Sequence, residues 1–538
     1  MSLPHARHAL AFGLFVALCM AHPAQSATTP PDLDWDTCER SNPYIGEQHD
    51  GVSVLCASMT VPRDYRTEDG TTARVQVMRI RKGPMHAIRP AIFFNFGGPG
   101  HDPRDQMERT VVNWLDIPAQ DDVHGAYRSI PDHYDLVTVV PRGIDAAHPL
   151  ECDFDKDPGL DDIYEKRNDE RAWQRLIDAT RTYAANCAPR AKHAGIDTTT
   201  YVGDIEMFRQ AAGYDRLSFY GASYGTKVAL WYGATHPEKV HRVVLDGSLD
   251  VTRTWAQLTK AWPEQRSMAF YDAALQPATD DPRAFDLGTH PGVAYTWLMR
   301  MPLWLRMAWQ EAIQGPEDVL AAVTMDRWMR AGKTTPQIRA MLDTYDFSAV
   351  PEVNNAAIHS AARLYRLMHR SHLLPGQGMV QQAASAIADT SGPVNLAVQC
   401  SDSPWDGNVA SWRRFVVDTL AYTFTLAEGD IVGSLVCAQW PRTDIVAPDI
   451  ASVARLKSVL MIHGEYDRRA PWAGAQKTLA LMPQARVLLA RDTTAHGLLN
   501  TSRSRCIEPT VAQFLLHGTV PVKKITHCDD YLPLYADR

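Results

Sequence analysis

A serine flanked by two glycines is the feature of this 538-residue sequence with the clearest chemical potential. The pattern Gly-x-Ser-x-Gly covers residues 221–225, with Ser223 at its centre. An apolar run, residues 217–220, precedes it, and a helix-compatible run, residues 226–233, follows it. Strand, sharp turn and helix are therefore expected, and glycines suit such a turn because larger side chains would collide with its neighbours. So short a pattern also arises by chance, so a nucleophilic role for Ser223 requires further partners.

A base and an acid are the partners that a nucleophilic serine needs. The base removes the hydroxyl proton, and a carboxylate fixes the tautomer of the base. On a sheet with this kind of turn, the chain order is serine, acid, histidine. Asp467 follows the apolar run 459–462 and His496 follows the apolar run 487–490, so each is expected just beyond the carboxyl end of a strand. We predict Ser223, Asp467 and His496 as a catalytic triad. The competing candidates are His463 for the base, and Glu465 and Asp492 for the acid.

An oxyanion hole is also predicted, because acyl transfer to serine develops negative charge on the carbonyl oxygen. One donor is expected to be the backbone N–H of Tyr224, directly after the serine. The second is expected from Gly98, in the glycine-rich turn Gly-Gly-Pro-Gly at residues 97–100. Alone, this sequence is equally compatible with a simple tight turn.

The elements that must position these residues are strands that alternate with helices. Strands are predicted at residues 74–80, 90–96, 133–140, 217–220, 241–245 and 458–463. Helical patterns lie between several of them, including residues 165–185 and a shorter helix at 204–212, with Asp204 as its N-cap and Gly213 as its stop. This alternation predicts an α/β fold: a mostly parallel, doubly wound sheet with helices on both faces.

About 200 residues of different texture separate the strand that ends near Gly247 from the next strand of the same kind. Helical runs are predicted there at residues 295–313, 317–331, 335–342 and 355–368. The first is rich in Trp, Met and Leu, which favours packing over a ligand site. The expected division is a first core part at 27–250, a mainly helical cap at 251–449 and a second core part at 450–538.

Residues 1–26 have the pattern of a signal peptide, with Arg7 before an apolar stretch and small residues before the expected cleavage after Ser26. The apolar stretch is too short to span a bilayer, so the mature chain is predicted to be exported, either to a periplasm or out of the cell, with no integral membrane span. The formal net charge is -8 and no basic run occurs, which argues against nucleic acid as a partner.

Eight cysteines remain after the predicted signal peptide, and they occur as four close pairs along the chain. An even number in an exported chain favours disulfides over a metal site, and free buried thiols are the alternative. We predict that neighbours pair. The four predicted bonds are Cys38–Cys56, Cys152–Cys187, Cys400–Cys437 and Cys506–Cys528.

Several of these motifs together resemble the α/β-hydrolase branch of proline iminopeptidases and tripeptidyl aminopeptidases. They are the early GGPG, the YGASYG turn, VVLDGSLD, HGEYD and AHG. The carboxyl-terminal part resembles a segment of secreted tripeptidyl aminopeptidases, through Cys400-Ser401-Asp402, Cys437-Ala438-Gln439-Trp440-Pro441 and the last cysteine pair. The resemblance implies an α/β-hydrolase fold with a large helical cap inserted before the strand that carries the catalytic Asp.

The activity that the resemblance implies is that of an exported serine exopeptidase, without metal or cofactor, that acts on peptides with free amino termini. Two departures lie where the pocket rim is expected: His101-Asp102-Pro103 follows the GGPG turn in place of Gly-Ser-Gly, and residues 140–147 depart from the family's Asp-x-Arg-Gly-x-Gly-x-Ser. Both bear on substrate choice more than on reaction type.

A substrate ammonium in a partly buried pocket calls for carboxylates. Asp402 is the first candidate to bind it, followed by Glu206 and Asp406. A carboxylesterase or lipase-like enzyme with the same triad is the alternative function, since fold does not choose substrate. A binding protein on an inactive hydrolase fold is the third, non-enzymatic reading, and the sequence does not indicate the oligomeric state.

Overall fold

The computed structural model describes residues 32–38, 49–67, 69–84, 89–152, 160–342, 344–370, 391–425 and 428–534. The predicted signal peptide at residues 1–26 lies outside these ranges. Within them, no helix combines the length and the apolar character needed to cross a bilayer.

The described strands form one ten-stranded sheet with the order β1-β2-β3-β5-β4-β6-β7-β8-β9-β10. Neighbours from β1 to β5 in this order are antiparallel, and all neighbours from β5 through β4 to β10 are parallel. The predicted mostly parallel α/β-hydrolase sheet is thereby confirmed. The strands are β1 (Asp36–Thr37), β2 (Val52–Pro62), β3 (Thr72–Lys82), β4 (Ala91–Asn95), β5 (Asp135–Val139), β6 (Leu217–Ala222), β7 (Val240–Asp246), β8 (Val459–Gly464), β9 (Arg486–Ala490) and β10 (Ile525–Cys528).

Helices cover both faces of the sheet, because successive side chains of a strand point to opposite faces. On β4, Ile92 and Phe94 belong to one buried cluster and Phe93 to the other. The first cluster includes side chains of α2 (Pro103–Asp116) and α21 (Glu508–His517). The second includes side chains of α5 (Glu170–Ala194), α6 (Thr198–Ala211), α7 (Tyr224–Thr235) and α20 (Trp472–Ala480). The central strands are therefore buried on both sides, which explains their continuous apolar runs.

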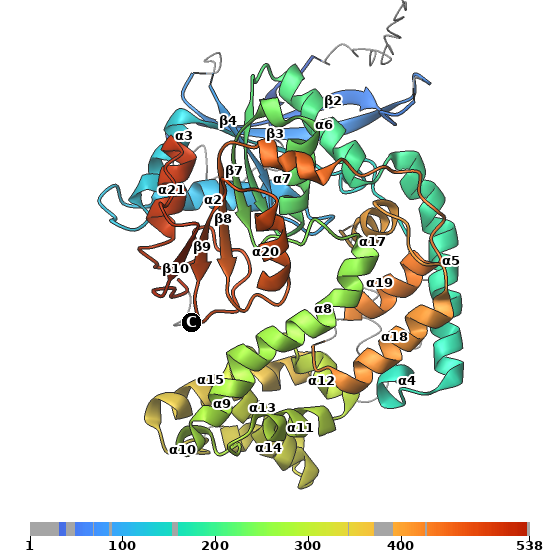
Figure 1. Ribbon diagram of the computed structural model, residues 1–538, viewed down its shortest axis with the longest axis vertical. Helices are drawn as coiled ribbons and strands as arrows, with labels where there is room; N and C mark the ends of the chain where they lie inside the picture. Colours follow the sequence, from blue (N-terminus) through green and yellow to red (C-terminus); the bar gives the residue numbers. More distant parts are fainter. Residues whose placement is uncertain are drawn as a thin grey trace, which may run out of the picture.

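Between β7 and β8, every element that the structure describes is helical. These helices form the cap, which lies below the sheet in Figure 1 and has an apolar cluster of its own containing Leu298, Met301 and Trp309. The Trp and Met residues thus pack against one another. The cap helices are α8 (Trp255–Phe270), α9 (Gln276–Asp280), α10 (Pro282–Phe285), α11 (Pro291–Arg300), α12 (Leu303–Trp309), α13 (Pro316–Arg330), α14 (Thr335–Leu342), α15 (Pro351–Arg370), α17 (Ser391–Ser401), α18 (Val409–Tyr422) and α19 (Glu428–Ala438).

Two local predictions about helices are corrected. The predicted helical run 295–313 is two helices, α11 and α12, and Pro302 is the N-cap of the second, since proline cannot donate the N–H that would continue the first. Helix α6 begins at Thr198 with Asp197 as its N-cap, whereas the predicted cap, Asp204, lies inside the helix and pairs with Arg142 at 2.7 Å.

Helix α5 belongs to the first core part in sequence but also contacts the cap. It runs alongside the molecule from the sheet to the cap, and it packs against α17 and α19 (Figure 1). The short helix α4 (Leu160–Glu165), just before it, contacts α12. The cap is therefore supported by two consecutive helices from a distant part of the chain.

Four disulfides join neighbouring cysteines along the chain: Cys38–Cys56, Cys152–Cys187, Cys400–Cys437 and Cys506–Cys528. Each closes a loop with a sequence separation between 18 and 37 residues. One of them, Cys400–Cys437, ties α17 to α19 within the cap.

Candidate active site

Ser223 occupies a strained turn between β6 and α7. Its φ of 54° and ψ of -121° lie outside the regions that residues with a side chain ordinarily adopt. A Cβ atom added at Gly221 would lie 2.3 Å from the carbonyl oxygen of Gly225, and one added at Gly225 would lie 2.2 Å from that of Asn95. Neither position accepts a side chain, so close packing explains both glycines of the pattern.

Asp467 and His496 meet at the carboxyl ends of β8 and β9. The Nδ1 atom of His496 lies 2.6 Å from Oδ2 of Asp467. The other carboxylate oxygen accepts hydrogen bonds from the backbone N–H groups of Arg469 and Ala470, which fixes the orientation of Asp467. With Nδ1 bonded to the carboxylate, Nε2 is left to face a substrate or nucleophile.

The competing residues are engaged elsewhere. His463 is fully buried and its Nε2 contacts the carbonyl oxygen of Ala470. Glu465 pairs with Arg491 at 2.5 Å and also accepts the backbone N–H of Asp492. Of the three candidate acids, the structure brings only Asp467 into contact with His496.

Opposing effects act on the pKa values of this pair. Burial lowers the pKa of His496, but the contact with the Asp467 carboxylate and the nearby Asp246 carboxylate outweigh it, so the pKa lies above the usual value. Burial raises the pKa of Asp467, but the imidazole of His496 outweighs this effect and the pKa lies below the usual value. The surroundings therefore favour a protonated imidazole next to a charged carboxylate.

The two predicted oxyanion-hole residues, Gly98 and Tyr224, line the same pocket as Ser223. Tyr224 is the first residue of α7, where backbone N–H groups lack intrahelical acceptors. The N–H of Gly97 instead donates to the side chain of Asn95 at 2.9 Å. A Cβ atom at Gly97 would approach that of Ser223 to 2.9 Å, so this glycine-rich turn lies directly against the serine.

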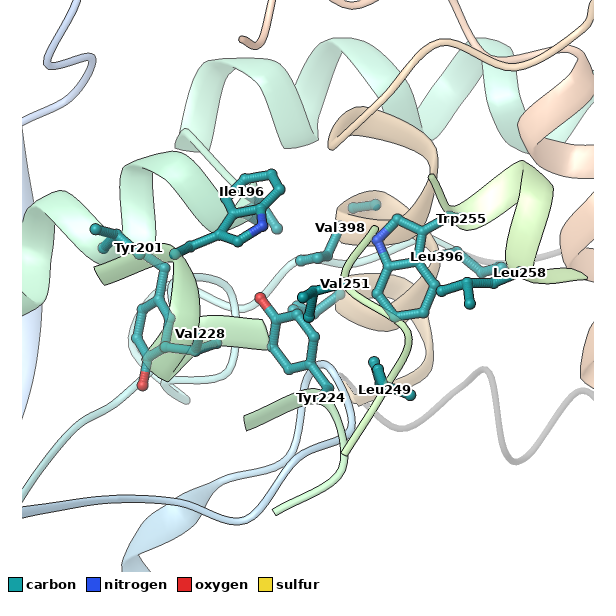
Figure 2. Packing of buried hydrophobic residues seen from close by; sticks show 14 of the residues in the cluster. Ile196, Tyr201, Tyr224, Val228, Leu249, Val251, Trp255, Leu258, Leu396 and Val398 are labelled. Atoms are coloured by element: carbon teal, nitrogen blue, oxygen red, sulfur yellow. The ribbon is translucent and has the colours of Figure 1, made fainter. Parts of the chain in front are cut away.

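A pocket of about 520 Å³ opens over Ser223 and His496. Its floor comes from the core and its walls from the cap helices α8, α17 and α19. Figure 2 shows part of the packing between core and cap, where Tyr224 of the core lies among residues that include Leu396 and Trp255 of the cap. The charged side chains of the described lining, apart from histidines, are Arg266, Arg469 and Asp430, and Arg266 pairs with Asp430 at 2.5 Å.

The residues that line the pocket fit neither a typical peptidase pocket nor a typical esterase pocket. A cluster of carboxylates would favour a peptidase and an entirely apolar wall an esterase. The described lining combines Trp255, Trp262 and Leu249 with the Arg266–Asp430 pair.

The carboxylates predicted to bind a substrate amino terminus do not line this pocket, which corrects that prediction. Asp402 is 1% exposed and accepts hydrogen bonds from Thr198, from Lys227 and from the indole N–H of Trp255. These hydrogen bonds compensate for the burial of the Asp402 carboxylate. They also join the end of α17 to α6, α7 and α8.

Glu206 has a similar structural role. It accepts hydrogen bonds from Arg209, Gln210 and Tyr232 within the core, and these bonds outweigh burial and lower its pKa to about 2. Asp430, the carboxylate among the described lining residues, was not predicted, since nothing in its local sequence distinguishes it from other acids on cap helices.

Comparison with known proteins agrees with this geometry. Residues 426–528 match a family model described as TAP-like protein. A tripeptidyl aminopeptidase of Streptomyces lividans is 24% identical over 509 residues, which cover 92% of this chain and 86% of the relative. This chain is similar to tripeptidyl aminopeptidases over nearly its whole length. The similarity to tripeptidyl aminopeptidases extends beyond the matched segment to the Ser223 turn and the cap, and it supports a serine hydrolase or peptidase.

Other relatives carry different names. Serine protease Hip1 of Mycobacterium tuberculosis is 24% identical and covers 91% of this chain and 89% of its own. Carboxylesterase B of the same species is also 24% identical, with the same two coverages. Among solved structures, a proline iminopeptidase of Mycobacterium smegmatis is 14% identical, covers 86% of this chain and 98% of its own, and has a TM-score of 0.31.

Proposed function

We propose that this chain is an exported serine exopeptidase, similar to tripeptidyl or prolyl aminopeptidases, that cleaves peptide bonds near free amino termini. The observation that carries the proposal is the His496–Asp467 pair at 2.6 Å, beside a strained Ser223 in a pocket that the cap covers. The names of the tripeptidyl aminopeptidase and serine protease relatives support a peptide substrate.

In the proposed reaction, Ser223 Oγ attacks the scissile carbonyl carbon while Nε2 of His496 takes its proton. The N–H groups of Tyr224 and Gly98 stabilise the oxyanion, and His496 then donates the proton to the leaving amine. In the second half of the reaction His496 takes a proton from water, the water oxygen attacks the acyl carbon, and His496 returns the proton to Oγ of Ser223 as the acyl–Oγ bond breaks and the acid product leaves. Among the described residues, no hydrogen bond joins Ser223 to His496, although both line the same pocket; catalytic hydrogen bonds are often long in free enzymes and tighten in the substrate complex.

The amino terminus of the substrate is assigned to Asp430. It is the carboxylate among the described lining residues, and it lies on cap helix α19, across the pocket from the core. Its pairing with Arg266 means that a bound ammonium would share the carboxylate with a guanidinium or displace it. This assignment predicts that Asp430→Asn lowers activity on amides with free amino termini and leaves turnover of a short-chain aryl ester, which has no ammonium, unaffected.

Export is part of the proposal. Four disulfides favour an oxidising compartment, and residues 1–26 have the features of a signal peptide. Amino-terminal sequencing of the protein from the culture medium and the periplasm tests this point. A mature chain that begins at Met1 would contradict it.

The test of function is steady-state hydrolysis of matched substrates by wild type and Ser223→Ala. The set contains an amino-acyl and a tripeptidyl chromogenic amide, the same amides acetylated, and a short-chain aryl ester. Activity on the free amides that acetylation abolishes, and that Ser223→Ala lacks, supports the exopeptidase. Ester turnover alone would instead favour the carboxylesterase, which the relative of that name and the Trp-lined wall make the second candidate.

A further inference from the structure

Asp246 is a buried carboxylate close to two segments that are far apart in the sequence. One is the turn that carries Ser223 and the other is the segment that follows His496. Asp246 is the last residue of β7 and its side chain is 0% exposed. Neither the triad nor the oxyanion hole uses it. Its position is central, because β7 lies between β6, which leads to Ser223, and β8, which leads to Asp467.

The side chain of Asp246 holds the segment directly after His496. The backbone N–H of Leu498 donates to its two oxygens at 2.9 and 2.7 Å, and that of Leu499 donates at 3.0 Å. The hydroxyl of Tyr220 on β6 donates at 2.8 Å. A carboxylate can accept all of these bonds at once, and each donor is buried and would otherwise remain unsatisfied.

The backbone of the same residue holds the serine turn. The N–H of Ser223 donates to the carbonyl oxygen of Asp246 at 2.8 Å. Asp246 therefore contacts the serine turn through its main chain and the histidine segment through its side chain. The same residue thus bonds both segments directly, without an intervening residue.

We propose that Asp246 is a positioning residue that fixes His496 relative to Ser223 and stabilises the protonated imidazole during catalysis. The inference rests on the proposed serine-hydrolase mechanism, but it does not depend on whether the substrate is a peptide or an ester. The negative charge matters because the imidazole gains a positive charge in the transition state, in a site where water screens little.

The electrostatic surroundings agree with this role. Asp246 contributes to the raised pKa of His496, and burial raises its own pKa to about 6, although the hydrogen bonds from Tyr220, Leu498 and Leu499 oppose that rise. The titratable groups that face it are Tyr220 on β6, Tyr127 from residues 125–129, His496 and Tyr531, and Glu508 on α21 faces Tyr220 and Tyr127 in turn.

The deciding experiment compares Asp246→Asn with wild type in pH profiles of kcat/KM and in kcat and KM at one pH. We expect kcat to fall roughly 10- to 100-fold with KM changed less than about twofold, because a misplaced base weakens the transition state more than ground-state binding. The acid limb of the profile should move to lower pH, since the imidazolium loses a negative neighbour. Asp135→Asn is the control: it removes a fully buried carboxylate on β5, paired with Arg81 and far along the strand from the site.

Asp135→Asn should alter stability and leave the acid limb in place. If Asp246→Asn does not fold, Tyr220→Phe tests the proposal instead. This variant removes the hydroxyl that donates to Asp246 and keeps the Asp246 carboxylate. We expect a two- to fivefold lower kcat and a smaller shift of the limb in the same direction. An unchanged limb and an unchanged kcat in a folded Asp246 or Tyr220 variant would overturn the proposal.

The rate of labelling by a fluorophosphonate separates this inference from the proposed function. The reagent reacts with an activated serine and needs no peptide group. If Ser223→Ala blocks labelling while the Asp246 variant labels as fast as wild type, the triad stands and this inference fails. If wild type and Ser223→Ala label alike, the proposed mechanism itself fails.

Discussion

At the scale of single residues, the geometry of the site depends on positions where no side chain fits. Gly247 directly follows Asp246 and has a φ of 60°. A Cβ atom there would lie 2.9 Å from Nδ1 of His496 and 3.3 Å from Oδ2 of Asp467. The glycine after β7 is therefore explained by the bond between imidazole and carboxylate, and not only by a turn.

This contact predicts the effect of Gly247→Ala. We expect kcat to fall at least tenfold, because the methyl group displaces the imidazole, in addition to a backbone strain of roughly 1–2 kcal/mol in the free energy of unfolding. The matched control is Gly213→Ala, with a φ of 74° and no atom within 4 Å of the added Cβ. It should show the backbone cost with normal kcat. Equal kcat values for the two variants would contradict the account.

The His496–Asp467 pair predicts a pH dependence. The pKa of His496 lies above its ordinary value of 6.5, so kcat/KM should fall as pH drops through a midpoint above 6.5. The stability that the pair provides is fully present below the unfolded-state pKa of the histidine and is lost as pH rises through the higher folded-state pKa.

Asp467→Asn should move the acid limb to lower pH and reduce kcat by roughly 10³-fold or more. Measurement of kcat and kcat/KM for both proteins between pH 5 and 9 checks the kinetic predictions, and urea unfolding of wild type over the same range checks the stability.

At the scale of elements, one buried ion pair joins the cap to the core. Lys227 on α7 lies 2.7 Å from Asp402, at the end of α17, and its ammonium lies over the rings of Trp231 and Trp255 at 4.6 and 4.5 Å. Asp402 also bonds Thr198, whose hydroxyl contacts that of Tyr224 at 2.8 Å. The cap is therefore connected to the residue that follows the nucleophile.

Removing one partner of this pair should cost more than removing both charges. Lys227→Met leaves a buried carboxylate without its cation, and we expect a loss of about 3–5 kcal/mol in the free energy of unfolding. The double variant Lys227→Met/Asp402→Asn should recover part of that loss, because no unpaired charge remains. Urea unfolding of the two single variants and the double variant measures this coupling. Strict additivity would show that the pair does not act as a unit.

At the scale of the whole molecule, the pocket lies between two units that the chain builds from separated segments. The cap is inserted between β7 and β8, and the disulfide Cys400–Cys437 joins the two cap helices that supply Asn395, Gln399 and Asp430 to the pocket. The disulfide Cys506–Cys528 joins the end of the edge strand β10 to the segment just before α21, both in the core.

These positions predict different consequences for the two bonds. Replacing either pair by serines should lower stability by roughly 3–4 kcal/mol in the chain-entropy model, because the cost depends only on the logarithm of the loop length and the sequence separations are 37 and 22 residues. Loss of Cys400–Cys437 should also raise KM, since the cap wall loosens, while loss of Cys506–Cys528 should leave KM unchanged in the folded enzyme. Thermal unfolding and steady-state kinetics of the two double variants test this. An equal effect on KM would contradict the assignment of the cap wall.

Sequence periodicity located most of the sheet, but not its margins. Central strands such as β4 and β8 are buried on both faces, so their apolar runs are unmistakable. The edge strand β10 has four residues and only one is buried, and the long antiparallel β2 alternates with polar residues, so neither was predicted. Helix α6 starts six residues before the predicted N-cap, because Asp197 and Asp402 both bond the N–H groups of a threonine run with weak helix propensity.

By itself, the sequence determined the nucleophile turn, the order of the three triad candidates and the cysteine pairs, because each depends on local backbone requirements or on proximity along the chain. Only the tertiary structure decided which carboxylates face the pocket. Asp402 forms an ion pair with Lys227, which is 175 residues away in the sequence. Asp430 and Asp246 are likewise surrounded by residues from distant segments of the chain. The role of a carboxylate depends on its burial and partners, and both arise when segments far apart in the chain come into contact.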